Sequence, residues 1–102
     1  MKTFIVDIDG TICTDSRGNY ELARPMHSRI HYFNDLHKKG HKVIYWTARG
    51  GNSGIDWTDL TKKQLEDWGV NYTELRMNKP SYDFWIDDKA YNGNRFFDEL
   101  YI

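Results

Sequence analysis

The sequence contains one cysteine, two prolines and no long hydrophobic run, and its formal net charge is −1. A single thiol, Cys13, excludes a disulfide within the chain and a zinc site made of several cysteines. The balance of charges excludes a strongly basic surface of the kind that binds nucleic acids or anionic membranes, but it allows a small anionic substrate. The N-terminal stretch has no apolar core like that of a signal peptide. These absences predict a cytoplasmic protein without a membrane segment.

The length of the chain bounds its architecture. Its 102 residues suffice for one domain with a single core. No repeat, low-complexity tract or change of composition divides the sequence. We therefore expect one domain over residues 1–102.

Short apolar runs alternate with stretches of helical periodicity. The apolar runs predict strands at residues 4–6, 41–46, 70–75 and 82–86. The segments between them predict a small hairpin or flap at residues 11–23, helices at 25–39 and 57–68, and a packing helix or extended tail at 94–102. Strands that alternate with helices favour an α/β fold, here a Rossmann-like parallel sheet with helices on both faces.

Polar residues follow three of the expected strands. Asp7 and Asp9 come after the first strand, Thr47 ends the second, and Asp87 and Asp88 end the last. Because the carboxyl ends of parallel strands meet at one edge of a sheet, these side chains are expected to converge. Buried carboxylates need a partner, and a divalent cation is the usual one. The convergence predicts a metal-assisted site for phosphoryl transfer.

The order of these residues resembles the haloacid dehalogenase superfamily of phosphatases. That superfamily has Asp-x-Asp-Gly-Thr after its first strand, here residues 7–11 (DIDGT), and a Thr or Ser at the end of the next motif strand, here Thr47. A lysine follows, here Lys79, and then an acidic pair, here residues 87–88. The segments around these four parts resemble a small branch without a cap domain that is associated with capsular polysaccharide biosynthesis.

The resemblance implies hydrolysis in two steps. The first aspartate, Asp7, would attack phosphorus and form an aspartyl-phosphate. The second, Asp9, would protonate the leaving alcohol and then accept a proton from the attacking water. Mg²⁺ would bind Asp7, the backbone carbonyl of Asp9, and Asp87, while Asp88 would hold a water on the metal.

The resemblance also implies a set of phosphate-binding residues. They are Gly10, Thr47, Ala48 and Lys79. Thr47 would donate its hydroxyl, helped by the Ala48 N–H, and Lys79 would supply a fixed positive charge. Lys79 and Asp87 are only eight residues apart, so the lysine reaches the site only if the chain reverses between them. The alternative cations are Arg49, Arg76 and Lys89.

The sequence leaves no room for a cap domain. The flap at residues 11–23 and the loop after the second expected strand are too short to contain one. The site should therefore be open, so that it accepts a bulky substrate or is completed by a second copy of the chain in a homo-oligomer. The residues expected to line its mouth are Arg17, Tyr20, Arg49, Asn52 and Trp57.

Together these features predict a Mg²⁺-dependent phosphatase that acts on a sugar phosphate or a similar small metabolite. An alternative substrate is a nucleotide or the 3′ end of a polynucleotide, against which stand the pI of about 6.4 and the lack of a basic stripe. A further alternative is a non-catalytic phospho-acceptor module, since receiver domains also combine Asp, Thr, Lys and a metal. The acid two positions after Asp7 favours hydrolysis over that alternative.

Overall fold

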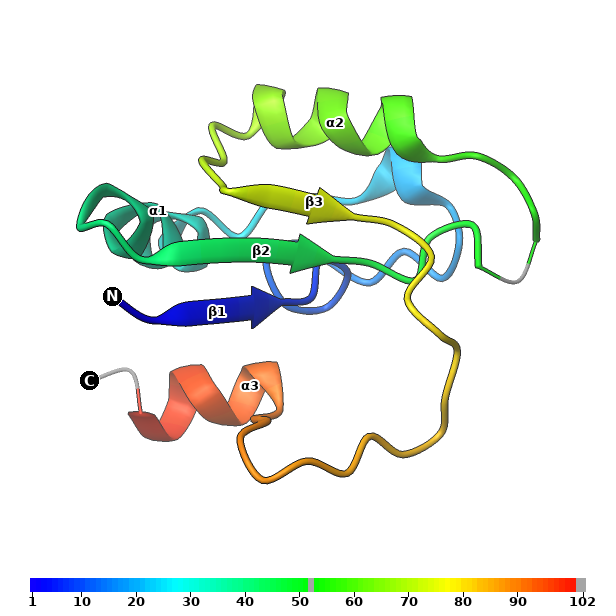
Figure 1. Ribbon diagram of the computed structural model, residues 1–102. Helices are drawn as coiled ribbons and strands as arrows, with labels where there is room; N and C mark the ends of the chain where they lie inside the picture. The colour runs from blue at the N-terminus through cyan, green and yellow to red at the C-terminus, as the bar shows by residue number, and fades with distance from the viewer. Residues whose placement is uncertain (52, 101–102) are drawn as a thin grey trace.

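A computed structural model describes residues 1–51 and 53–100 (Figure 1). Its sheet has three parallel strands in the order β1 (Thr3–Val6), β2 (Lys42–Trp46) and β3 (Glu74–Arg76). Tyr45 of β2 pairs with Val6 of β1 on one side and with Leu75 of β3 on the other. The three strands therefore end at the same edge of the sheet. The predicted parallel α/β class is confirmed, and the part of the chain that the structure describes contains no cap domain.

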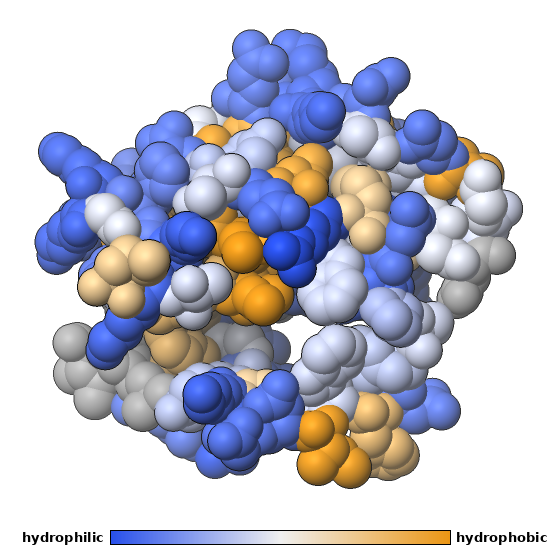
Figure 2. All heavy atoms as spheres, viewed as in Figure 1, coloured by the Kyte–Doolittle hydropathy of each residue, from blue (hydrophilic) through white to orange (hydrophobic). Residues whose placement is uncertain are grey.

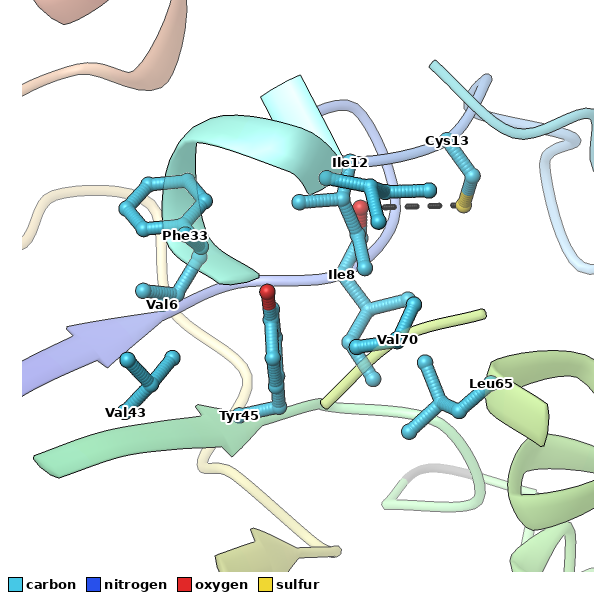
Figure 3. Close-up of a cluster of buried hydrophobic side chains, with 10 residues drawn as sticks. Val6, Ile8, Ile12, Cys13, Phe33, Val43, Tyr45, Leu65 and Val70 are labelled. Atoms are coloured by element: carbon cyan, nitrogen blue, oxygen red, sulfur yellow. Dashed lines mark hydrogen bonds between the residues drawn. The ribbon is translucent and has the colours of Figure 1, made fainter. Parts of the chain in front are cut away.

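Two helices, α1 (His27–Lys38) and α2 (Thr58–Asp67), connect the strands. The strands are added in one direction across the sheet, so right-handed connections place both helices on the same face. Accordingly, Phe33 of α1 and Leu65 of α2 share one buried cluster with Tyr45 of β2 (Figure 3). The core lies on the face of the sheet that these helices cover.

Glycines end both helices, as the sequence predicts. Gly40 and Gly69 adopt left-handed φ angles of +94° and +71°, a conformation that a Cβ atom disfavours. Beyond Gly69, the N–H of Val70 donates back to the carbonyl of Leu65 at 2.9 Å. This bond caps α2 and turns the chain toward β3.

The segment at residues 11–23, predicted as a hairpin or flap, forms a flap without two regular strands. Ile12 and Cys13 are fully buried, and this stretch pairs with residues 24–26: the N–H of Thr14 donates to the carbonyl of Arg24 at 2.9 Å, and the N–H of Met26 donates to the carbonyl of Ile12 at 2.8 Å. Cys13 forms an isolated bridge with Pro25. The second half contains a short 3-10 helix, η1 (Tyr20–Leu22). The flap is thus a loop that is anchored at its start.

The fourth strand predicted at residues 82–86 does not form. Residues 77–92 contain no helix or strand and run around the sheet to the side of β1 in Figure 1. Phe84 and Ile86 are 86% and 94% exposed. A strand needs a neighbour for its backbone groups and apolar side chains, and this segment does not pair with β1. The third strand also begins later than the predicted residues 70–75.

The C-terminal region packs as a helix over its described residues. It consists of α3 (Gly93–Arg95), which continues as η2 (Phe96–Leu100). The rings of Phe96 and Phe97 each lie 5.7 Å from the ring of Tyr32 in α1, between centroids. Residues 101–102, which the sequence analysis includes in this tail, lie outside the described residues. No helix in the described ranges is long and apolar enough to cross a membrane.

Candidate active site

Asp7 and Lys79 form an ion pair at the carboxyl edge of the sheet. Asp7 follows β1 directly, and its Oδ1 lies 3.0 Å from Nζ of Lys79. The N–H of Lys79 donates to the carbonyl of Thr47 at 2.9 Å, and Asn78 just before it has a left-handed φ of +60°. The side chain of Asp7 is 40% exposed, against 13% for Lys79. Asp7 is therefore open to a ligand while a mostly buried ammonium balances its charge.

Asp9 is held by Arg49. Nε of Arg49 donates to Oδ2 at 2.9 Å and one terminal nitrogen donates to Oδ1 at 2.8 Å, which is a bidentate pairing. The Arg49 side chain is 0% exposed, whereas that of Asp9 is 18% exposed. The guanidinium of Arg49 is thus buried and bound to Asp9, and a contact of Arg49 with a substrate stays a prediction.

The other side of the Arg49 guanidinium faces α2 and the flap. Its second terminal nitrogen, Nη1, donates to Oγ1 of Thr61 at 3.1 Å and to Oε1 of Gln64 at 2.6 Å. Its central carbon lies 4.6 Å from the centre of the Tyr20 ring. Burial lowers the pKa of Arg49, but the hydrogen bond and charge of Asp9 outweigh burial, so the pKa lies above its ordinary value. The guanidinium therefore stays charged.

Cys13 lies beside the same carboxylate. Its Sγ is 3.6 Å from Oδ1 of Asp9 and 3.6 Å from the carbonyl of Ile8; Figure 3 shows the second contact. Burial, followed by the charge of Asp9, raises the pKa of the Cys13 thiol to about 12. The thiol is neutral and acts as a weak donor, not as a nucleophile.

The expected phosphate-binding residues lie in tightly bonded loops. Thr47 is 1% exposed, and its hydroxyl oxygen accepts the N–H of Arg49 at 3.2 Å. The N–H of Gly10 donates to the carbonyl of Cys13 at 2.9 Å. Ala48 is exposed beside them. Phosphate contacts of these residues stay predictions.

The acidic pair at the end of the predicted fourth strand lies on an irregular segment instead. Asp87 and Asp88 are both exposed. The N–H of Lys89 donates to Oδ1 of Asp87 at 2.9 Å. That hydrogen bond, followed by one with Asp88, holds the pKa of Asp87 below its ordinary value. The two residues form a local turn instead of a strand end.

A hollow separates the acidic pair from the first strand. It measures about 960 Å³ and is lined by Asp7 and Asp9 on one side and by Asp87 on the irregular segment; Figure 2 shows its opening below the main body. No group of three or more His, Cys, Asp or Glu side chains in residues 1–51 and 53–100 is arranged to hold a metal ion. The residues as placed do not fit the predicted magnesium site.

Of the other residues predicted at the mouth, two are in contact with each other. Tyr20 and Trp57 are half-buried and pack edge to face, with ring centroids 5.1 Å apart. Trp57 also lines a smaller hollow of about 280 Å³. Arg17 is exposed on the flap with a left-handed φ of +53°. Asn52 lies outside the described residues. Contacts of these residues with a substrate stay predictions.

Thr61 and Gln64 are absent from the predicted candidates, although both are buried. They lie three residues apart on α2, on the face that also carries the buried Leu65. A polar pair on the buried side of a helix signals a buried polar partner, because unpaired polar groups are costly in a core. That partner is Arg49.

One protein family and several solved structures are similar to this chain. The family described as "Polynucleotide kinase PNKP phosphatase domain" matches residues 1–90. A crystal structure of a protein from Vibrio cholerae is 30% identical, with a TM-score of 0.81 over 94% of this chain and 87% of that chain. No curated protein matches the chain.

Two further similar structures are those of a Pnkp1/Rnl/Hen1 complex, one of them described as an RNA repair complex. Each contains a chain that is 21% identical to this one, with TM-scores of 0.62 and 0.61. The likeness covers 97% of this chain but only 34% and 32% of those chains. At that identity it shows a shared fold alone.

Proposed function

The chain belongs to the family of polynucleotide kinase PNKP phosphatase domains, within the haloacid dehalogenase superfamily, and from this premise we propose that it removes phosphate from the end of a polynucleotide or from a nucleotide. Hydrolysis of phosphate monoesters follows from the family; the substrate and the roles of single residues are the proposal. The observation that carries it is the pair of Asp7 and Lys79, 3.0 Å apart at the carboxyl edge of the sheet.

Asp7 is the nucleophile in the proposed reaction. Its carboxylate oxygen forms a bond to phosphorus as the bond from phosphorus to the leaving oxygen breaks. Asp9 gives its proton to that leaving oxygen. A water then attacks the aspartyl-phosphate, Asp9 takes the proton of that water, and inorganic phosphate leaves with Asp7 restored.

Lys79 supports the first step through its charge. An anionic carboxylate and an anionic phosphate repel each other, and a fixed ammonium next to both offsets the repulsion. The 3.0 Å contact to Asp7 and the limited exposure of Lys79 support this role. A charge that is mostly shielded from water acts more strongly than one in bulk solvent.

A polynucleotide end is the favoured substrate because of the family to which the chain belongs. The absence of a cap domain from the described residues also leaves the edge of the sheet open to a large substrate. The match supports placing the polynucleotide end ahead of the sugar phosphate, which is the first substrate predicted from the sequence.

A sugar phosphate is the second candidate. The net charge of −1 favours it, because proteins that bind polynucleotides by their backbone gain affinity from clustered Lys and Arg. A role in capsular polysaccharide biosynthesis belongs to this candidate and rests on the sequence resemblance alone. A cytoplasmic location and a homo-oligomeric state accompany either candidate as expectations.

Mg²⁺ enters the proposal through the resemblance. The expected ligands are Asp7, the carbonyl of Asp9, Asp87 and Asp88, and within the described residues they are not arranged as a group that could hold a metal ion. Activity measured with Mg²⁺ and with an excess of chelator tests the dependence directly.

A substrate panel tests the proposed function. Phosphate release is measured from 3′-phosphorylated oligonucleotides, nucleoside monophosphates and sugar phosphates, with Mg²⁺ present, for the wild-type chain and for Asp7→Asn. We expect the oligonucleotides to have the highest kcat/KM and the variant to be inactive on every substrate. A higher kcat/KM for a sugar phosphate would select the second candidate. Equal release by the variant would contradict the role of Asp7.

A further inference from the structure

We propose that Gln64 and Thr61 of α2 position the acid Asp9 through Arg49, and that Gln64 links this positioning to the flap. The inference rests on the proposed function, because it assigns these residues to the proton transfer made by Asp9. Gln64 and Thr61 are positioning residues here, since they reach the reacting atoms only through Arg49.

The Arg49 guanidinium is almost fully occupied by hydrogen bonds. Of its five N–H donors, two bind Asp9, at 2.9 and 2.8 Å, and two bind Thr61 and Gln64, at 3.1 and 2.6 Å. A planar group bonded on two sides cannot rotate without breaking several bonds. The orientation that α2 gives to Arg49 is therefore passed to the carboxylate of Asp9.

Gln64 carries the connection on to the flap. While its Oε1 accepts from Arg49, its Nε2 donates to the carbonyl of Tyr20 at 2.6 Å. The ring of Tyr20 lies 4.6 Å from the guanidinium carbon. One amide thus holds both the backbone of η1 and the cation beneath the Tyr20 ring. A displacement of the flap at Tyr20 would change the support of Asp9.

The arrangement suits a proton transfer better than a role in stability alone. Asp9 is the partially exposed end of the network, with 18% of its side chain exposed, and Arg49 is the buried end. Replacing a buried ion pair with apolar groups often leaves stability unchanged or raises it. A carboxyl group that is fixed beside the nucleophile, in contrast, is what general acid and general base catalysis require.

Substrates with different leaving groups distinguish a positioning role of Gln64 and Thr61 from a purely structural one. Departure of p-nitrophenolate needs no proton, whereas an alcohol leaving from a sugar or a nucleotide does. A variant that misplaces Asp9 should therefore lose kcat/KM for an alkyl phosphate and keep kcat/KM for p-nitrophenyl phosphate, because kcat/KM covers only the steps up to departure of the leaving group and excludes the later step in which Asp9 acts as a base. A variant that only loosens the fold should lose both equally.

The experiment compares Gln64→Met, which keeps the size and removes both hydrogen bonds, with Lys63→Ala on the exposed side of the same helix. We expect Gln64→Met to lower kcat/KM for an alkyl phosphate about 10-fold and to change kcat/KM for p-nitrophenyl phosphate by less than about 2-fold. Lys63→Ala should change neither. Thr61→Val should show the same selective loss. This second variant keeps the inference testable if Gln64→Met does not fold. Equal loss on both substrates, or no loss, would overturn the inference.

A second readout does not depend on activity. The ¹³C NMR signal of the Asp9 side-chain carboxyl should shift in Gln64→Met and stay in place in Lys63→Ala. An unchanged signal in Gln64→Met overturns the positioning role even if the wild-type chain hydrolyses no substrate. Wild-type inactivity on both phosphates, combined with a shifted signal, would instead overturn the proposed function and leave the network intact.

Discussion

Lys79 reaches Asp7 across 72 positions of sequence, with Nζ 3.0 Å from Oδ1. The contact depends on the backbone, because the Lys79 N–H is bonded to Thr47 and Asn78 has a left-handed φ. Two loops that follow neighbouring strands thereby place a cation beside the first acid of the chain. This ion pair is the centre of the proposed active site.

Removal of the Lys79 charge should slow the reaction without unfolding the protein. For Lys79→Ala we expect kcat/KM to fall about 10²-fold, because one positioned charge next to the phosphate is lost. Lys39→Ala removes another lysine that pairs with an aspartate, on the surface of α1, and should leave kcat/KM unchanged. Steady-state phosphate release measures both. A loss of less than about 3-fold for Lys79→Ala would show that another cation serves the phosphate.

Removal of Asp9 should destabilise the fold as well as slow the reaction. Asp9→Ala leaves the buried Arg49 without its counter-charge, and we expect the free energy of unfolding to drop by about 3 kcal/mol. Asp35→Ala, which breaks an exposed pair with Lys39, should cost less than about 1 kcal/mol. Urea denaturation gives both values. An equally small loss of unfolding free energy in both variants would mean that the bidentate pair of Asp9 and Arg49 contributes little to stability.

Cys13 should resist alkylation in the folded protein. Its pKa of about 12 leaves almost no thiolate near pH 8, and the side chain is fully buried. We expect iodoacetamide to modify the folded chain about 10²-fold more slowly than the urea-unfolded chain. Mass spectrometry measures the modification in both states. Rapid modification of the folded chain would show that the thiol is accessible.

The same thiol should make stability fall at alkaline pH. An unfolded thiol loses its proton near its ordinary pKa of about 8.5, whereas the folded thiol keeps it up to about 12. Between these values the unfolded state binds fewer protons, so the free energy of unfolding decreases as the pH rises. Cys13→Ala should show a shallower decrease over this range in denaturation curves. An identical pH dependence in the two proteins would argue against the raised pKa.

Tyr45→Phe should be tolerated or stabilising. The Tyr45 ring is fully buried, and its hydroxyl has no hydrogen-bond partner within the described residues. Burial raises the pKa of this phenol above its ordinary value. Removal of an unpaired polar atom should raise the free energy of unfolding by up to about 1 kcal/mol. A loss of similar size would mean that the hydroxyl has a partner such as a buried water.

The sequence predicts the parts of the fold that depend on local patterns. The alternation of strands and helices, and the helix ends at Gly40 and Gly69, follow from short-range periodicity and from the backbone freedom of glycine. The convergence of Asp7 and Thr47 at one edge follows from the parallel sheet. These features need no knowledge of which distant residues touch.

Features that depend on distant contacts are predicted poorly. Residues 82–86 have the composition of a strand, but strand formation depends on a pairing partner, and in the structure this segment has none at β1. Arg49 looks like a surface residue in a polar loop, and only its contacts with Asp9 and Gln64, 40 and 15 positions away, bury it. The role that we propose for Gln64 cannot be predicted from the sequence, because it depends on those contacts.

The most direct test of the account is to identify the residue that carries the phosphoryl group during turnover. The wild-type chain is mixed with a 3′-phosphorylated oligonucleotide, quenched in acid within the first turnovers, digested and analysed by mass spectrometry. The account predicts one phosphoryl group on the peptide that contains Asp7, and none there in Asp7→Asn. Steady turnover with no phosphoryl group on Asp7, or with the group on another residue, would contradict it.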